Sequence, residues 1–460
     1  MLTSPVTGDS RLSFWLRVRE FAVPASMIET ATARRRAGDW GGACAAAGFD
    51  VDLQPRSVAR VHGAELAARV RADLRHLAPD LLRWHMPRIA PDGLLRPGVT
   101  LTLARYDSEG KRPVHLVVRT PPAWADAGQR ISLALWDGSS GSGAGGSRHP
   151  HPPPHRRYRL DLHRHLWDAR RADELRVRSG VDAPPVTDPA VLGPVPQGRR
   201  CAVDRWAAEA AILLRAEGRS DGRVGVRCGA RHRLVLDLVA NRDGPPAMRI
   251  TEASASGAAS ALPVLPDAAT WVLPDLELLR TGAIEAERLH PLVAAALVPG
   301  HVPDSSAAVP DPAGQPRLVD CRGALHRIGL VDGALAPLDH DPAEVRREEL
   351  LAALNGTPLP CLRVIDETHR HPECLDDVRE RLAHGDVSGA LAVVEGLLGP
   401  DAVLRGGALR DELEAAARQR IVYGLFRAGM AGPGPGRVRF DKARPRPGAH
   451  RSRPRPATRG

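Results

Sequence analysis

Histidine and aspartate gather in one short segment, Tyr158-Arg-Leu-Asp-Leu-His-Arg-His165, which Asp168 follows closely. We expect this segment to form a strand, in which Asp161, His163 and His165 would lie on one face. Carboxylates and imidazoles that share a face serve both divalent-metal sites and general-base pairs. The same alternation is typical of any half-buried strand. Metal binding by Asp161, His163, His165 and Asp168 is therefore one of two interpretations.

A second group of candidate ligands lies in the C-terminal part of the chain. His369-x-His371-x-x-Cys374 brings two imidazoles and a thiol together, with Cys361 nearby, and zinc accepts all of these groups. The spacing matches no standard zinc finger, and Pro372 would interrupt a helix between the ligands. The alternative is a polar helix end beside a buried cysteine. The sequence assigns no cofactor and leaves zinc or another divalent metal open.

Most of the positive charge lies in the last 24 residues. Of the net charge of +10, the segment from Arg437 to Gly460 carries +8, because nine basic residues there face Asp441 alone. Prolines separate these residues, so we expect a disordered tail that attracts nucleic acid or other anionic partners. The chain has only two lysines, and codon bias towards arginine is the alternative explanation. The candidate anion-binding residues are Arg437, Arg439, Lys442, Arg444, Arg446, Arg451, Arg453 and Arg455.

Several motifs of large enzyme families are absent. The chain contains no Gly-x-x-x-x-Gly-Lys phosphate loop and no His-Glu-x-x-His metalloprotease motif. With two lysines, one of them in the tail, lysine-based covalent catalysis is disfavoured. These absences favour a binding role over an enzymatic one.

Apolar residues at steps of three and four predict helices at both ends of the chain. The run from 342 to 430 is expected to contain an antiparallel hairpin, with helices over 372–384 and 386–398, and a third helix over 408–428. Residues 10–86 are also predicted to be helical, with one long helix over 57–77.

The same turn sequence occurs in both helical regions. Gly38-Asp-Trp-Gly-Gly-Ala43 and Gly385-Asp-Val-Ser-Gly-Ala390 share the skeleton Gly-Asp-x-x-Gly-Ala, in which glycine ends one helix and aspartate caps the next. This turn resembles the one between the two helices of a tetratricopeptide hairpin. No repeat of about 34 residues joins the two copies, so we expect two separate capped hairpins.

Between the helical regions, alternating residues predict short strands. The fold class expected is α+β, with helical N-terminal and C-terminal regions that flank small antiparallel sheets. The predicted strands are 99–103, 114–118, 131–136, 223–227, 232–239, 248–251, 318–320 and 325–330. The predicted divisions are a helical region with a small sheet (1–137), a Gly/Ser/His/Pro-rich linker (138–157), an α+β middle region (158–340), a C-terminal helical region (341–430) and the basic tail (431–460).

Six cysteines without a Cys-x-x-Cys pair, and no apolar run near 20 residues, predict a cytoplasmic protein with no membrane association. The function expected is a non-enzymatic binding or assembly adaptor that contacts a protein partner through its helical hairpins. One alternative is association with nucleic acid through the Arg-rich tail. The second alternative is a metal-assisted, hydrolase-like enzyme that uses the Asp161 to Asp168 segment.

Overall fold

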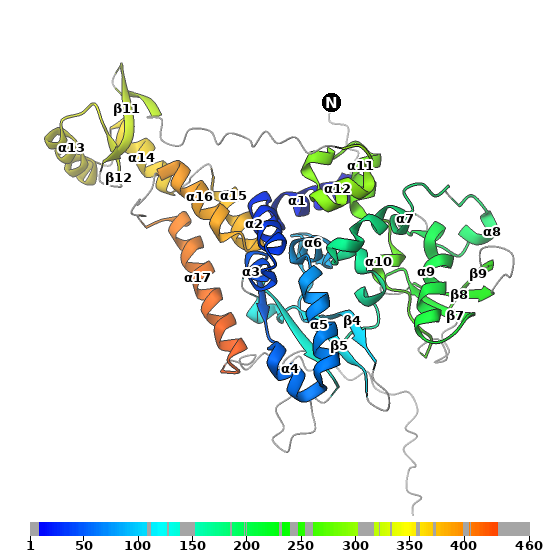
Figure 1. Cartoon of the computed structure of the whole chain (residues 1–460). Coiled ribbons are helices and arrows are strands. Elements are labelled where there is room, and N and C mark those ends of the chain that lie inside the picture. Colours follow the sequence, from blue (N-terminus) through cyan, green and yellow to red (C-terminus); the bar gives the residue numbers. More distant parts are fainter. Residues whose placement is uncertain are drawn as a thin grey trace, which may run out of the picture.

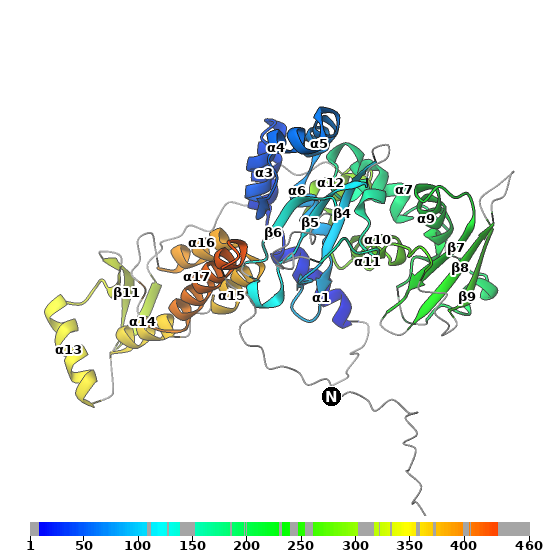
Figure 2. The same cartoon turned by 90° about the horizontal axis from the view of Figure 1, so that it is seen from below.

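The computed structural model has the α+β architecture predicted from the sequence, arranged as three neighbouring parts (Figures 1 and 2). A central body lies between a unit built on strands β7–β9 and a C-terminal module that begins at strand β10. The structure describes residues 9–430 apart from 108–111, 127, 139–151, 185, 197, 199, 230–231, 240–246, 254–260, 302–316, 322, 332–333, 356–358, 371–373, 399–403 and 405.

Six helices open the chain, as the periodicity predicts. They are α1 (Asp9–Phe21), α2 (Ala25–Arg36), α3 (Trp40–Ala46), α4 (Pro55–His62), α5 (Ala64–His76) and α6 (Pro79–His85). The prediction of one helix over 57–77 is wrong, because Gly63 takes a φ of +94° and separates α4 from α5. Val61, near the end of α4, is 71% exposed.

A four-stranded sheet lies under these helices in the order β1-β6-β5-β4. Strands β4 (Thr100–Tyr106), β5 (Val114–Arg119) and β6 (Ile131–Trp136) pair antiparallel, as expected. Strand β1 (Phe49–Val51) was not predicted and pairs parallel with β6, with Phe49 opposite Ile131. Three residues are too few to show an alternating pattern. A short hairpin of β2 (Arg88–Ile89) and β3 (Leu94–Leu95) and a 3-10 turn, η1 (Ala123–Ala125), complete this region.

The strand predicted over Tyr158–His165 is not formed. The chain instead makes the 3-10 turns η2 (Leu160–Leu162), η3 (Arg164–Leu166) and η4 (Ala169–Glu174), followed by α7 (Leu175–Ser179). Leu160, Leu166 and Trp167 are buried in the main core, which also receives side chains of α11 (Pro274–Arg280) and α12 (Pro291–Leu297). The 3-10 turn η6 (Ala286–Arg288) lies between these two helices in the chain and has no buried residue. Described residues on both sides of the predicted 138–157 linker therefore contribute to one core.

A second core lies in the neighbouring unit. Helices α8 (Pro189–Leu192), α9 (Val203–Ala216) and α10 (Asp267–Thr270) accompany an antiparallel sheet of β7 (Gly222–Arg227), β8 (Arg233–Val239) and β9 (Ala247–Glu252). Trp206 of α9 is fully buried against Val224, Val226 and Leu236 of the sheet.

The C-terminal module starts with an antiparallel sheet of β10 (Arg317–Cys321), β11 (Ala324–Val331) and β12 (Ala334–Pro337). Five helices follow: α13 (Pro342–Asn355), α14 (Pro360–Arg370), α15 (Leu375–His384), α16 (Val387–Leu398) and α17 (Ala408–Arg427). Helix α17 returns to the central body, where the Tyr423 hydroxyl donates to Asp50 over 2.5 Å. The two C-terminal hairpin helices and the final helix are confirmed within a few residues.

The two turns with the shared skeleton have the same local structure. The Asp39 carboxylate accepts from Gly42 N over 2.8 Å, and the Asp386 carboxylate accepts from Gly389 N over 2.9 Å. An arginine five residues earlier binds each carboxylate, Arg34 over 3.3 Å and Arg381 over 3.1 Å. A Cβ atom at Gly42 or Gly389 would collide with the capping carboxylate, which explains the glycine in the skeleton.

Among the described residues, no helix combines the length and the apolar character that crossing a membrane requires.

Candidate functional site

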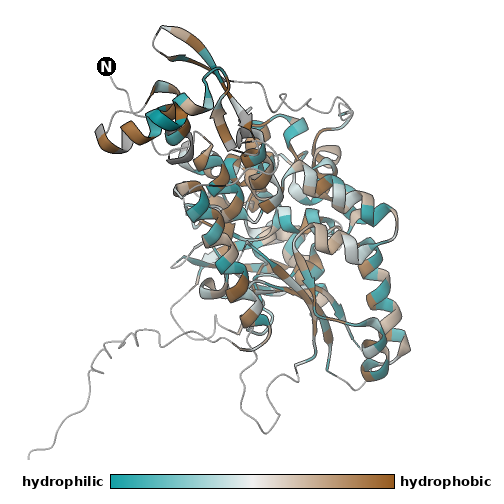
Figure 3. Cartoon of the chain, turned by 90° about the vertical axis from the view of Figure 1, so that its left-hand side faces the viewer, coloured by the Kyte–Doolittle hydropathy of each residue, from teal (hydrophilic) through white to brown (hydrophobic). Residues whose placement is uncertain are grey.

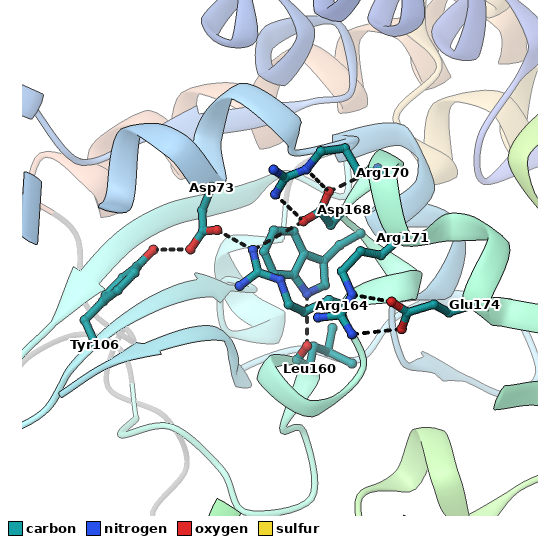
Figure 4. Close-up of polar contacts among 9 residues, drawn as sticks. Asp73, Tyr106, Leu160, Arg164, Asp168, Arg170, Arg171 and Glu174 are labelled. Carbon is teal, nitrogen blue, oxygen red and sulfur yellow. Dashed lines mark hydrogen bonds and ion pairs between the residues drawn. The ribbon is translucent and has the colours of Figure 1, made fainter. Parts of the chain in front are cut away.

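The four residues of the first predicted metal set lie in or next to the 3-10 turns: Asp161 belongs to η2 and His165 to η3, while His163 precedes η3 and Asp168 precedes η4. The two carboxylates of the set bind arginines. The Asp161 carboxylate pairs with Arg159 over 2.7 Å. The Asp168 carboxylate caps η4 and binds Arg170 over 3.0 Å and Arg164 over 3.3 Å (Figure 4). These guanidinium groups outweigh burial and lower the pKa of Asp168.

The two imidazoles of this set are buried side by side, with ring centroids 5.7 Å apart. Burial lowers the pKa of His163 to about 4 and lowers the pKa of His165 well below its usual value, so both rings are neutral at pH 7. The Nδ1 atom of His163 faces the Arg178 guanidinium at 3.2 Å. Metal binding by this set stays a prediction. In the structure, both of its carboxylates form ion pairs with arginines.

The other predicted sites fall partly or wholly outside the described residues. His371 and the whole Arg-rich set of the tail lie outside the described residues, as does the side chain of His369 in α14. Cys374 lies at the start of α15 and packs against the core of the C-terminal hairpin.

A different set of ligands comes together in the C-terminal module. Among the described residues, one group of three or more His, Cys, Asp or Glu side chains is arranged to hold a metal ion: Cys321, His326, His340 and Cys361. One donor atom from each side chain lies within 4.8 Å of all the others. Cys321 ends β10, His326 lies on β11, His340 follows β12, and Cys361 lies in the first turn of α14.

Two features of the chain position this cluster. The β10–β11 hairpin is tight, with Cys321 opposite Ala324 and Val319 opposite His326. Beyond β12, the Asp339 carboxylate accepts from the Arg327 backbone N–H over 2.7 Å and from its guanidinium over 2.7 Å. These two interactions between Asp339 and Arg327 hold the backbone next to His340 in place.

A concentration of positive charge lines a cavity of about 380 Å³ between the central body and the β7–β9 unit. Its walls combine seven arginines with four aromatic side chains and one carboxylate, that of Asp267. The arginines are Arg11, Arg19, Arg88, Arg96, Arg157, Arg178 and Arg205, and the aromatic residues are Trp15, Trp84, Tyr158 and Trp271.

Four of these arginines bind carboxylates: Arg11, Arg19, Arg157 and Arg178 pair with Glu277, Asp275, Asp267 and Glu209, respectively. The other three have no ion pair among the described residues. Arg88 donates to the Arg83 carbonyl oxygen over 2.8 Å, and Arg205 donates to the Trp271 carbonyl oxygen over 2.8 Å. The Arg96 side chain is exposed.

Burial leaves several cavity-lining polar atoms without a hydrogen-bond partner in the described structure. They are Nε of Arg88 and Arg205, Nε2 of His85 and Nδ1 of His165. Burial also lowers the pKa of both guanidinium groups, although the Glu209 and Asp204 carboxylates act on Arg205 in the opposite direction.

The C-terminal module differs from the rest of the chain in what it exposes. Twelve of the sixteen large apolar side chains that are exposed among the described residues lie at or beyond Leu318, although this part is the smaller one. Figure 3, in which this module faces the viewer, shows apolar segments on its surface helices. On α13, Leu350, Leu351 and Leu354 are 63%, 42% and 82% exposed.

Sequence reasoning missed the Cys321–Cys361 cluster because the ligands are spread over 40 residues and follow no finger spacing. The sequence signal that could have indicated it was the pair Cys321-x4-His326, which lies where the two predicted strands 318–320 and 325–330 follow one another closely. One further motif, Gly218-Arg-Ser220-Asp-Gly222, has the residue pattern of a nucleophile elbow. It leads from helix α9 into strand β7, the reverse of the strand-to-helix order that such an elbow requires.

Comparison with known proteins gives no match to a family model, to a curated protein or to a solved structure.

Proposed function

We propose that this chain is a binding protein whose ligand is a small organic anion, a phosphate group joined to a planar ring, held in the cavity between the central body and the β7–β9 unit. The observation that carries the proposal is the set of three cavity arginines, Arg88, Arg96 and Arg205, without a carboxylate partner among the described residues.

A buried or half-buried guanidinium without a counter-ion, such as that of Arg205 or Arg88, is costly, and a bound anion removes that cost. The exposed Arg96 adds a further positive charge to the same cavity. Guanidinium groups also match phosphate oxygens in geometry, since their N–H donors form a planar fork. The volume of about 380 Å³ is within the range of small-molecule sites.

The aromatic side chains that line the cavity indicate the second half of the ligand, the planar ring. Trp15 and Trp84 both lie against the Arg19 guanidinium, at 5.3 Å and 4.4 Å from ring centroid to Cζ. Trp271 and Tyr158 line the same space. Planar rings stack on such surfaces, so a mononucleotide combines both features that the walls recognise.

The test is titration calorimetry of the full chain with AMP, with inorganic phosphate and adenosine as half-ligands. We expect saturable AMP binding that weakens as salt is raised, because ion pairs to phosphate are screened. Arg96→Ala should weaken AMP binding about tenfold or more, since a charge-assisted hydrogen bond contributes about 1.5–3 kcal/mol.

Arg71→Ala, at an exposed position on α5 outside the cavity, is the matched control and should leave AMP binding unchanged. Binding of neither AMP nor phosphate at millimolar concentration would refute the proposal. Equal binding by wild type and Arg96→Ala would refute this placement of the phosphate.

A second function, assembly with a protein partner, is favoured by the exposed apolar residues of the C-terminal module. A patch of this kind on α13, with Leu350 and Leu354 on adjacent turns, fits an amphipathic helix of a partner. This is the adaptor role expected from the sequence, with the contact surface moved to α13.

Leu350→Glu combined with Leu354→Glu should abolish retention of the partner without altering the folded core, because both side chains are exposed. The measurement is capture from native cells with wild-type and variant baits, followed by rebinding of the purified partner. Val61→Glu and Val177→Glu, at exposed apolar positions elsewhere, should retain it. A partner held equally well by the Leu350/Leu354 variant would exclude α13 as the contact.

A further inference from the structure

We propose that Cys321, His326, His340 and Cys361 bind one Zn²⁺ ion, which holds strands β10–β12 against helix α14. Neither predicted metal set contains this combination, and it does not depend on the function proposed for the cavity. Four ligands come from four different elements, so a single ion would link the whole segment from 317 to 370.

The donor atoms have the spacing of a compact metal site. The Cys361 Sγ atom lies 3.8 Å from His340 Nε2, close to the roughly 3.6 Å between a sulfur and a nitrogen ligand on tetrahedral zinc. The Nδ1 atom of His326 lies only 2.5 Å from His340 Nε2, so both ring nitrogens point at the same small volume. An ion between them would separate the rings to about 3.3 Å.

The surroundings of two ligands support metal binding. The Nδ1 atom of His340 faces the Glu344 carboxylate at 3.6 Å while its Nε2 atom faces the cluster. A carboxylate on the outer nitrogen of a ligating histidine is the usual way to fix the tautomer and the ring orientation. Cys361 lies in the first turn of α14, and its Sγ atom faces the same Nε2 atom of His340.

The small core of this segment gives the ion a structural role. Besides Pro337, only five apolar side chains are buried in the described part of 317–370: Cys321, Ile328, Leu359, Cys361 and Ile365. A segment of this size with so little buried apolar surface needs a crosslink, and two of the five are the proposed ligands. On binding, the two thiols release their protons and the two neutral imidazoles donate lone pairs, which gives a neutral Zn(Cys)₂(His)₂ centre.

Two thiolates with two imidazoles in a closed, four-ligand arrangement favour zinc over the harder cations that prefer oxygen. With all four positions taken by protein, no position remains for water or substrate. We therefore infer a structural ion rather than a catalytic one.

The test is elemental analysis of the full chain, made without an affinity tag, after dialysis against metal-free buffer. We expect about one zinc per chain. Cys361→Ser, and Cys321→Ser together with Cys361→Ser, should lower the zinc content below about 0.1 per chain. Cys374→Ser removes the thiol of the other predicted set and should leave the zinc content unchanged.

Cobalt substitution of the wild-type chain tests the proposal without any variant, so it applies even if a ligand variant does not fold. The proposed centre would show the visible bands of tetrahedral Co²⁺ and a thiolate-to-cobalt charge-transfer band. Wild-type chain with less than about 0.1 zinc and without these bands overturns the proposal. Zinc lost in Cys374→Ser and kept in Cys361→Ser would overturn it as well.

Discussion

Arg83→Met is expected to lower the free energy of unfolding by about 3–5 kcal/mol, because it removes the donor of four buried hydrogen bonds. The Arg83 side chain is 1% exposed. It donates to the carbonyl oxygens of Ala22 over 3.1 Å, Ala47 over 3.4 Å, Gln129 over 2.7 Å and His384 over 2.8 Å. Methionine has a similar length and leaves these four acceptors without a partner.

Burial lowers the pKa of Arg83 to about 10, so the guanidinium is still charged at pH 7. The loss should therefore appear across the neutral range. His384 belongs to α15, so the variant should also increase hydrogen exchange in the C-terminal hairpin. If Arg83 stabilised the N-terminal helices alone, hydrogen exchange in this hairpin would not change.

Denaturant unfolding followed by tryptophan fluorescence measures the change, with Arg71→Met on the exposed face of α5 as the matched control. The control should change stability by less than about 0.5 kcal/mol. A loss below about 1 kcal/mol for Arg83→Met would show that the four carbonyl groups find other donors.

Asp275→Ala should destabilise the central body by about 3–5 kcal/mol, because it leaves the buried Arg19 guanidinium without its counter-ion. The Asp275 side chain is fully buried and accepts from Arg19 over 2.8 Å and from Trp84 Nε1 over 3.1 Å. Arg19 also donates to the Trp84 carbonyl oxygen over 3.0 Å, so one carboxylate orders two side chains from α1 and α6.

The double variant Arg19→Met/Asp275→Leu distinguishes the cost of leaving one charge unpaired from the contribution of the ion pair itself. Replacing both charges with apolar groups removes the uncompensated cation, so we expect most of the lost stability to return. Arg11→Ala, which breaks the more exposed pair with Glu277, is the control and should cost less than about 1 kcal/mol. If the Arg19 and Asp275 effects simply add, the two side chains are not coupled as described.

The parts of the fold that depend on nearby residues were predictable. The turns at Gly38 and Gly385 follow from a glycine that ends one helix and an aspartate that caps the next, and all the groups involved lie within six residues. The strands β5 and β6 likewise follow from alternation along a few residues. The local rule failed at Tyr158–His165, where 3-10 turns produce a similar alternation of apolar and polar residues. Leu160 and Leu166 of these turns enter the main core, and Leu162 packs against the second core.

The candidate sites were not predictable in the same way. The zinc ligands His326 and Cys361 are 35 positions apart, and nothing local requires α14 to return to β10–β12. In the cavity, Arg88 and Arg205 come from different parts of the chain, and a guanidinium that lacks a carboxylate cannot be distinguished in the sequence from one that has it.

The amino-acid sequence by itself therefore determined most of the helices, most of the strands and the positions of the two aspartate caps, because these depend on steric and hydrogen-bonding preferences between neighbours. Tertiary structure alone decided which cysteines and histidines meet, which arginines share a cavity, and that Arg83 joins the N-terminal helices to α15. These contacts depend on how apolar faces pack across long sequence separations, and that packing is a property of the whole chain.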